Sequence, residues 1–382
     1  MKLRFLTAGE SHGKALVGIL EGLPAGLKLA AADVQADLMR RKKGHGRGNR
    51  QKIEGDKVEI LSGVRLGKTI GSPLALLVPN QDFKNWEGIM GVEPQAAPAS
   101  RRVDVPRPGH ADLVGKLKYG FDDMRDVLER ASARETAMRV ALGAAARRFL
   151  SECGVIVASR VVAIGGETDD SPLPCPVSKL NALTDLDPVR CANPNFSRRM
   201  VTRIDEAKAA GDTVGGVFEI FADNLPVGLG SYAQWDRRLE GPLCAALMSL
   251  NAIKGVEVGH GFRGAGVPGS QAHDAYEPRG RKVGYRTNHS GGLDGGMTTG
   301  QTLVLRAAMK PIATLMKPLD SVDLRTMKPA KAHIERSDAC AVPAAAVIGE
   351  SLACLVLADA VLDKFGGDSM AEILPRLAAW RK

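Results

Sequence analysis

Residues 130–149 read RASARETAMRVALGAAARRF, and this stretch predicts the helix around which the fold is built. Apolar side chains recur four, seven and eleven residues after the first of them, which places them on one face of a helix. The members of this stripe are Met138, Leu142, Ala145 and Phe149. The basic residues between them are expected to stay in water: Arg139, Arg147 and Arg148.

The start of this helix carries a capping-box pattern. Ser132 and Glu135 lie three residues apart, so each side chain is expected to accept a hydrogen bond from the backbone N–H of the other. A helix start also has free N–H groups and a positive dipole end, which makes Ser132 and its neighbours a candidate anion site. Capping alone is the simpler interpretation of the pair, and it is compatible with anion binding.

Outward from this helix, the chain alternates between strand and helix patterns. Strands are expected at 15–20, 58–64, 67–78, 155–164 and 214–222. Helices are expected at 31–41, at 243–255 and from about Pro343, which suits a first helical turn because it has no N–H. Residues 80–124 and 165–200 are rich in turn residues and are interpreted as loops, the first long and functional. No low-complexity linker interrupts residues 1–382, so one continuous domain is expected.

Composition favours a soluble protein of the reducing cytoplasm. The 382 residues are 44% hydrophobic, enough for a sizeable core, and the six cysteines form no CxxC pair or zinc-type spacing, so no metal site is expected. The N-terminus lacks the apolar stretch of a secretory signal. The apolar segment from Ala339 to Ala358 contains Glu350 and is Ala-rich, which indicates a buried core helix rather than a membrane span.

The charge of the chain favours an anionic partner. The formal net charge is +9, which suits nucleic acid, an acidic membrane surface or a charged metabolite. The basic residues cluster with Gly and His rather than with aromatic residues, and no nucleic-acid-binding motif is present. A nucleic-acid-binding protein nevertheless stays open as an alternative, because RRKKGHGRGNR at 40–50 is strongly basic.

Short segments that combine Arg, His or Ser with Gly carry the candidate chemistry. They are GESHG at 9–13, RKKGHGR at 41–47, RPGH at 107–110 and RASAR at 130–134. Histidine titrates near neutrality, and arginine presents a planar fork to phosphate or carboxylate. Each segment also has a simpler interpretation: a histidine that holds a turn, a solvated basic run, or a helix cap.

Several common catalytic motifs are absent from the sequence. Gly67-Lys68-Thr69 resembles the end of a P-loop, but Ser62 stands where the first glycine of that motif is required. There is no GxSxG elbow, no HExxH and no Rossmann GxGxxG. These absences argue against a standard NTPase, hydrolase, metalloprotease or dinucleotide site.

Taken together, the segments resemble the chorismate synthase family over nearly the whole chain. GESHGKALVGILEGLP, ERASARETAMRVALGA and RSDACAVPAAAVIGES resemble the three family signatures. RPGHAD, NAIKGVEVG, TNHSGGLDGGMTTG and MKPIATLMKP follow the family order. The chain departs from the family at Ala131, where a second Ser is common, and at Ala339, where Pro is common; neither change removes a reactive group.

The resemblance implies a fold, a reaction and partners. The expected fold is an α+β, single-domain β-α-β sandwich with helices between antiparallel sheets, assembled as a homotetramer. The expected reaction is a 1,4-anti elimination of phosphate from 5-enolpyruvylshikimate 3-phosphate, which gives chorismate and needs reduced FMN. This reaction is the last step of the shikimate pathway, and it involves neither nucleic acid nor membrane. A bifunctional form that also reduces FMN with NADPH is the alternative within the family.

The resemblance also implies roles for individual residues. His110 is expected to protonate reduced flavin, His12 to protonate the departing phosphate, and Asp338 to face flavin N5. The expected FMN contacts are Arg130, Ala131, Ser132, Ala133, Asn251, Ala252, Gly295, Lys310, Pro311, Ile312, Ala313, Thr314 and Arg336. The expected substrate contacts are Ser11, Arg41, Arg47, Arg107 and Arg134.

Overall fold

Two antiparallel sheets form the outer layers of the protein. The computed structural model describes residues 2–48, 53–94, 101–335 and 337–381. The first sheet has the strand order β1-β2-β6-β3, and the second has the order β10-β15-β9-β7-β8. The strands of the first are Arg4–Ala8, Ala15–Glu21, Leu74–Pro79 and Glu59–Ser62. Those of the second are Ile253–Val258, Leu303–Met309, Gly216–Asp223, Ile156–Ile164 and Glu167–Thr168.

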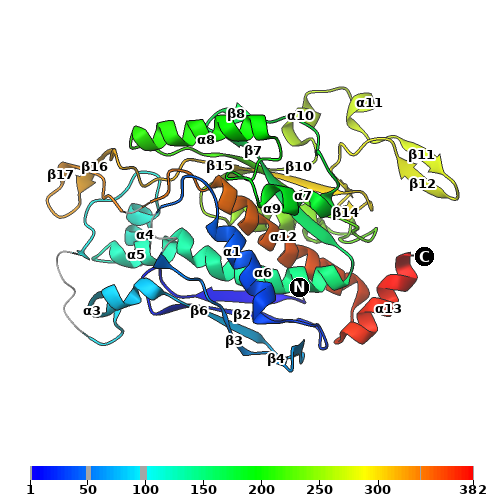
Figure 1. The fold of residues 1–382 in the computed structure, drawn as a ribbon, viewed down its shortest axis with the longest axis horizontal. Helices are drawn as coiled ribbons and strands as arrows, with labels where there is room; N and C mark the ends of the chain where they lie inside the picture. The colour runs from blue at the N-terminus through cyan, green and yellow to red at the C-terminus, as the bar shows by residue number, and fades with distance from the viewer. Residues whose placement is uncertain (1, 49–52, 95–100, 336, 382) are drawn as a thin grey trace.

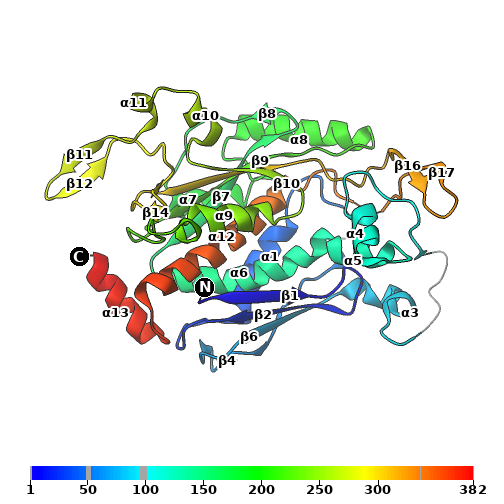
Figure 2. The ribbon, with the colours of Figure 1, turned by 180° about the vertical axis from the view of Figure 1, so that it is seen from behind.

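Helices lie between the two sheets and complete a sandwich (Figure 1). The central ones are α1 (Ala31–Lys42), α6 (Thr136–Glu152) and α12 (Val342–Phe365). Helix α6 packs on β2 and β6, α12 packs on β7 and β9, and the two helices pack on each other. Figure 2 shows the same layers from behind. The expected α+β sandwich with antiparallel sheets is confirmed.

Helices α6 and α12 approach closely because a glycine lies at their crossing. A Cβ built at Gly143 would lie 2.6 Å from the backbone oxygen of Ser351, far inside normal contact distance. The predicted stripe of α6 is confirmed, since Met138, Leu142, Ala145 and Phe149 are all fully buried. The glycine therefore belongs to the same buried face as the stripe.

Helix α12 is apolar because it runs through the core. It is long and apolar enough to cross a membrane, but 83% of its most apolar window is buried inside the protein. Pro343 lies in its first turn, as predicted. Glu350 is the acidic side chain in the middle of this helix, and it is completely buried.

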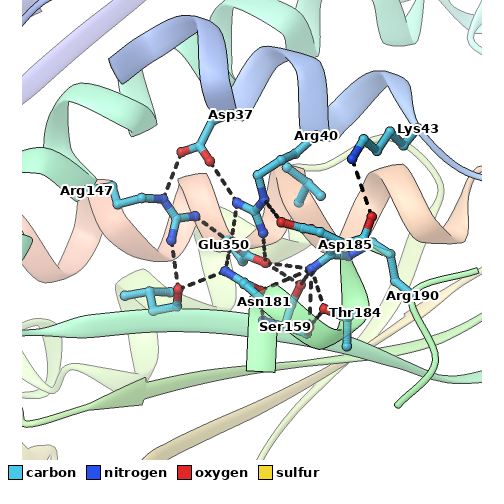
Figure 3. Close-up of polar contacts among 12 residues, drawn as sticks. Asp37, Arg40, Lys43, Arg147, Ser159, Asn181, Thr184, Asp185, Arg190 and Glu350 are labelled. Carbon is cyan, nitrogen blue, oxygen red and sulfur yellow. Dashed lines mark hydrogen bonds and ion pairs between the residues drawn. The ribbon is translucent and has the colours of Figure 1, made fainter. Parts of the chain in front are cut away.

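Glu350 is held by a network of basic and polar side chains from several elements (Figure 3). Arg40 of α1 donates two hydrogen bonds of 2.9 Å to its carboxylate, and Arg147 of α6 and Arg190 add further ion pairs. Ser159 of β7 and Asn181 also donate to it. Burial opposes ionisation, but the arginines outweigh it and hold the pKa of Glu350 well below its usual range. The network ties the helix layer to the second sheet.

This network corrects the prediction that Arg147 stays in water. Its guanidinium donates to Asp37 at 2.8 Å and to the carbonyl oxygen of Val157 at 2.7 Å, as well as to Glu350. The apolar stripe of α6 covers only part of the helix surface, so α1 and β7 enclose the adjacent flank. Local periodicity cannot predict a contact with a buried acid that lies 203 residues away in the chain.

The capping-box prediction is also wrong in detail. A 3₁₀ turn, η3 (Ala133–Glu135), precedes α6, and the Ser132 hydroxyl accepts from the N–H of Arg134 rather than from that of Glu135. The Glu135 carboxylate pairs with Arg139 one turn further on, at 3.0 Å. Ser132 therefore caps the turn alone.

Several predicted loops contain helices. Residues 165–200 include α7 (Val177–Thr184) and the start of α8 (Pro194–Ala209), and residues 80–124 include α4 (Asp112–Tyr119). The helix predicted at 243–255 is the shorter α9 (Glu240–Met248), which β10 follows.

The remaining elements are short helices and hairpins, apart from the C-terminal helix α13. The helices are η1 (Gln81–Asn85), α3 (Glu87–Met90), α5 (Arg125–Ala131), η4 (Trp235–Arg237), α10 (Gly261–Ala265), α11 (Gly269–Ala272) and α13 (Met370–Arg381). Short hairpins are β4–β5 (Val64–Arg65, Lys68–Thr69), β11–β12 (Tyr276–Arg279, Lys282–Tyr285), β13–β14 (Leu293–Asp294, Met297–Thr298) and β16–β17 (Asp320–Asp323, Lys328–Lys331).

Candidate active site

One cavity brings together residues from distant parts of the chain. Its volume is about 410 Å³, within the range of small-molecule sites. His12, His110 and Asp338, the residues predicted to be catalytic, all line it. So do the predicted substrate contacts Ser11, Arg41, Arg47, Arg107 and Arg134. The helix and strand ends that meet here are the end of α1, the α5–α6 junction, the α9–β10 turn, the end of β15 and the start of α12.

His12 is fixed by a carboxylate and an aromatic ring. Its Nδ1 lies 2.9 Å from Oε1 of Glu129, and its backbone N–H donates to Oε2 of the same residue at 2.7 Å. The indole of Trp86 stacks on the imidazole, with the ring centroids 3.9 Å apart. Arg101 and Arg125 lie over the Trp86 ring. The His12 side chain is 7% exposed, so it has little freedom to turn.

His110 lies in a second cluster built on a buried acid. Its Nδ1 is 2.5 Å from Oδ1 of Asp112, whose side chain is fully buried. Arg107 donates to both Asp112 oxygens through Nε and Nη2, and its Nη1 donates to Thr314. Burial raises the pKa of Asp112, but the bonds from His110 and Arg107 outweigh it, and the pKa lies well below its usual range. Asp112 is therefore an ionised acceptor.

Arg47 and Asp338 form an ion pair at the cavity wall. Arg47 Nη1 lies 2.7 Å from Asp338 Oδ2, and the N–H of Gly48 donates to Asp338 Oδ1 at 2.6 Å. The Nε of Arg47 is buried and has no hydrogen-bond partner among the described residues. This donor is available to an anion in the cavity.

Arg41 and Arg134 share one acidic partner. Arg134 pairs with Asp56 and donates to Asn80 at 2.9 Å, whereas Arg41 lies 3.6 Å from Asp56 and donates to Thr136. Burial lowers the pKa of Arg41 to about 10, and the neighbouring charges of Arg47 and Arg134 add to this effect against that of Asp56. The Nη1 of Arg41 has no hydrogen-bond partner in the described part of the chain. The charge of Arg134 is more fully compensated than that of Arg41.

Most of the predicted cofactor contacts also line the cavity. They are Ala131, Ser132, Ala133, Asn251, Ala252, Lys310, Ile312, Ala313 and Thr314. Pro311 lies between two of these residues but is not itself a lining residue. Arg336 lies outside the described residues.

Two predicted cofactor contacts lie away from the cavity. The guanidinium of Arg130 donates to the carbonyl oxygens of Thr7 and Gly9, so it fastens the end of β1 instead of lining the cavity. Gly295 is at the exposed turn of the β13–β14 hairpin, where its φ of +57° suits glycine. Neither residue faces the cavity within this one chain.

Sequence analysis missed the buried partners of the histidines. Asp112 follows His110 by two residues within RPGHAD, and Glu129 is the first residue of ERASARETAMRVALGA, so both lie inside segments already singled out. Trp86 and Asp56 had no comparable signal. Their contacts join parts of the chain that are separated by loops, and only the fold brings them together.

A basic, histidine-lined cavity of this size within a β-α-β sandwich is typical of an enzyme site for a small molecule. The family model described as chorismate synthase matches residues 3–362. The chain belongs to the chorismate synthase family.

Curated relatives match over almost their full lengths. The chorismate synthase of Moorella thermoacetica is 55% identical over 385 residues and covers 100% of this chain and 98% of that protein. The chorismate synthase of Thermobifida fusca is 52% identical, with 99% and 98% covered. A crystal structure of chorismate synthase, 41% identical, superposes with a TM-score of 0.80 and covers 100% of this chain and 97% of that one.

Proposed function

We propose that the protein converts 5-enolpyruvylshikimate 3-phosphate to chorismate by a 1,4-anti elimination of phosphate with reduced FMN, the last step of the shikimate pathway. The observation that supports this most directly is the single cavity shared by His12, His110 and Asp338. Family membership supports the same reaction.

The cavity suits a substrate with a phosphate and two carboxylates. Arg41 Nη1 and Arg47 Nε are buried donors with no hydrogen-bond partner in the described ranges, and both belong to cations. An anion placed between them gains charge-assisted hydrogen bonds and relieves the repulsion between the guanidinium groups. We assign these two residues to substrate binding, with Ser11, Arg107 and Arg134 around them.

The residues on another part of the wall suit a flat flavin ring. Asn251 donates through Nδ2 to the carbonyl oxygen of Ala131, while its Oδ1 is buried without a hydrogen-bond partner among residues the structure describes. This oxygen would accept from a ring N–H, and the small side chains of Ala133, Ala252 and Ala313 leave room for a planar ring. Lys310 would balance negative charge. These residues would hold reduced FMN, which would supply a reversible electron donor and an acceptor for the C6 hydrogen.

The protein residues control protons around this chemistry. His12 would donate a proton to the departing phosphate, and His110 would hold a proton beside the flavin. Asp338, oriented by Arg47 and Gly48, would assist removal of the C6 hydrogen from the substrate. Each group is held by neighbours that keep it in place before the ligands arrive.

An anaerobic assay tests the proposal. Purified protein, photoreduced FMN and 5-enolpyruvylshikimate 3-phosphate are expected to give chorismate and phosphate in equal amounts, followed by absorbance and by phosphate release. Omission of FMN is expected to stop both. Absence of chorismate under these conditions would refute the proposed reaction.

The same materials test the two alternatives. A bifunctional enzyme would turn over in air with NADPH and FMN and no other reductant. A nucleic-acid-binding protein would bind polynucleotide with a steep salt dependence and would not perturb the absorbance of FMN.

We also propose that residues 1–382 form one domain that assembles as a homotetramer in the cytoplasm. One hydrophobic cluster contains residues from both sheets and the central helices, which supports a single domain. The first sheet has helices on only one side (Figures 1 and 2). Its outer residues include Leu6, Ile19 and Leu61, which are 74%, 43% and 55% exposed, and an apolar sheet face of this kind favours self-association.

Sedimentation measures the assembly. The expected mass is four times the 40.5 kDa of one chain, and Leu6→Glu is expected to reduce it. Leu66→Glu, at an 86% exposed position in the β4–β5 turn, is the matched control and is expected to leave the mass unchanged. A monomeric parent protein would contradict the proposal.

A further inference from the structure

We propose that Asp112 and Glu129 are positioning residues, each of which holds Nδ1 of one cavity histidine so that the ring presents Nε2 to the ligands. The kinetic part of this inference rests on the proposed function. The geometric part does not, because it concerns contacts within the protein.

The first pair is Asp112 with His110. Asp112 accepts from the backbone N–H of Arg107 at 3.1 Å, from the Arg107 guanidinium and from His110 Nδ1. An ionised carboxylate can only accept, so the 2.5 Å contact places the hydrogen on Nδ1. Arg107 Nη2 also lies 3.0 Å from Nδ1 and 3.4 Å from Nε2, but its shortest contact is the 2.9 Å bond that it donates to Asp112 Oδ1. Nε2 is then the ring nitrogen left for the cavity, which His110 lines with a side chain that is 21% exposed.

The second pair is Glu129 with His12, built from unrelated elements. Glu129 lies in α5, and His12 lies between β1 and β2, 117 residues away in the chain. The carboxylate accepts from the backbone N–H of His12 and also faces Arg125, at 3.4 Å. His12 Nδ1 lies within hydrogen-bond distance of both carboxylate oxygens, at 2.9 and 3.1 Å, so this geometry assigns Nδ1–H as the donor from the ring. The Trp86 stack blocks one face of the ring and limits its rotation.

Neither carboxylate touches the ligand space. Their side chains are 0% and 1% exposed, and neither lines the cavity that both histidines line. They therefore act through the imidazoles. When a histidine donates, its Nε2–H bond breaks, the proton moves to the acceptor on the ligand, and the neutral ring keeps Nδ1–H against the carboxylate. The carboxylate stays ionised throughout and stabilises the protonated ring before transfer.

A purely structural role is the competing interpretation. Asp112 also holds Arg107, and Glu129 also faces Arg125, so either acid could serve only to neutralise a buried arginine. The two interpretations differ in what they predict for the histidine rings. Only the positioning role fixes the tautomer.

Histidine ¹⁵N NMR tests the tautomer directly and needs no activity. The chain has 7 histidines, and His12→Gln and His110→Gln assign the two signals. In the parent protein above the titration range, both rings are expected to carry the hydrogen on Nδ1. Asp112→Asn is expected to shift His110 toward the Nε2–H form or a mixture, and Glu129→Gln to do the same for His12. Unchanged tautomers in both variants would overturn the proposal.

Matched carboxylates provide the controls. Asp104→Asn removes an acid that accepts from Arg102, and Glu135→Gln removes an acid that pairs with Arg139. The polar partners of these two acids are arginines, not His12 or His110. Both controls are expected to leave the His12 and His110 signals in place. A tautomer shift in a control would mean that loss of any nearby carboxylate suffices, which would also overturn the proposal.

A double-mutant cycle tests the kinetic part. Asp112→Asn is expected to lower kcat by about 10²-fold or more with a small change in substrate KM, because the ring presents the wrong nitrogen. In a His110→Ala background the same substitution is expected to cost little more. If Asp112→Asn lowered kcat by the same factor in the His110→Ala background, Asp112 would act on the fold and not through the His110 ring. If the parent protein makes no chorismate, the proposed reaction fails, and the NMR result still decides the positioning role.

Discussion

Arg41 is buried beside two other cations, and this environment makes its charge costly. Its pKa of about 10 lies below the ordinary arginine value because burial and the neighbouring guanidinium groups disfavour the charge. A depressed basic pKa means that the charged form destabilises the folded protein at neutral pH. This cost declines as the pH rises above about 10 and is gone only above the ordinary arginine pKa. An anionic ligand offsets the same cost at neutral pH, so the cavity favours anions before any specific contact forms.

Arg47 offers the first test at this scale. Arg47→Ala is expected to raise the substrate KM by about 10- to 100-fold, the value of one or two charge-assisted hydrogen bonds, and to change kcat less. Steady-state kinetics under anaerobic conditions measure both constants. Arg65→Ala, on the exposed strand β4, is the control, and an unchanged KM for Arg47→Ala would place that side chain outside substrate binding.

His110 offers the second test. His110→Ala is expected to lower turnover by about 10²-fold or more, as for the loss of a general acid, while FMN binding stays largely intact. Turnover and a flavin titration measure the two effects separately. Normal turnover would remove His110 from the mechanism.

The sequence predicted reactive residues better than their partners. His12 and His110 stand out because each lies beside glycine in a short polar segment that no helix or strand pattern explains. The same segments do not show whether the charge of an arginine is already compensated by acidic partners. Arg134 and Arg41 look alike in the sequence, but in the structure Arg134 is paired with Asp56 and Glu54 and donates to Asn80. Charge compensation depends on contacts 54 to 80 residues apart in the chain, which no local pattern encodes.

At the scale of elements, Glu350 joins three helices to the second sheet. Glu350→Gln would leave Arg40, Arg147 and Arg190 without their shared counter-charge in a buried environment. The free energy of unfolding is expected to fall by about 3–5 kcal/mol, the usual cost of removing one partner from a buried ion pair. Urea unfolding followed by circular dichroism measures it.

A surface pair on α6, which packs against the helix of Glu350, is the natural comparison. Glu152 pairs with Arg148 near the end of α6, where both side chains are about one-third exposed. Glu152→Gln is expected to change the unfolding free energy by about 0.5 kcal/mol or less. Equal losses in the two variants would contradict the role given to the network.

Helices with a start signal or a clear apolar spacing were predictable, and helices with a narrow buried face were not. The limits of α1 follow from its apolar spacing, and the start of α12 follows from the proline of its first turn. Helix α8 was missed although Asn193 caps it and Pro194 opens it, because only Ser197, Met200 and Ile204 of its residues are buried. In a polar sequence, so narrow a buried stripe does not distinguish a helix from a loop. The structure shows the helix packed beside β8.

For the whole molecule, buried acids set the stability at low pH. The pKa of Glu335 is about 2, since Arg125 and His333 outweigh its burial, and the pKa of Asp274 is also about 2. Both lie below ordinary carboxylate values, so their contributions are complete above about pH 4.5 and are lost as the pH falls toward 2. Asp112 and Glu350 act in the same direction. Unfolding free energy is expected to drop steeply over this range.

Stability measured from pH 6 to pH 2 tests this expectation. Glu335→Gln is expected to lower the unfolding free energy at pH 6 and to flatten its decline below pH 4.5, because one linked proton is removed. Glu21→Gln, which breaks an exposed pair with Arg4, is expected to leave the curve unchanged. A parallel decline in the parent protein and in Glu335→Gln would show that other groups control acid unfolding.

The layered architecture was the part that physical patterns alone could not supply. Periodicity predicted hairpins and helices, but it did not say that β7, β9 and β15 belong to a different sheet from β1, β2 and β6. That division depends on pairing over long separations, such as Ile253 with Met309 and Ile156 with Asp223. The sandwich was expected only through the family resemblance.

The stacking of Trp86 on His12 gives the protein an optical reporter of its own. The chain has 3 tryptophans, and the other two, Trp235 and Trp380, are 79% and 53% exposed, so their replacement by phenylalanine leaves one buried indole. Emission from that indole is sensitive to the charge on the imidazole in contact with it and to a flavin that absorbs in its emission band. Fluorescence lifetimes of such a protein would follow proton and cofactor occupancy in real time without an added label.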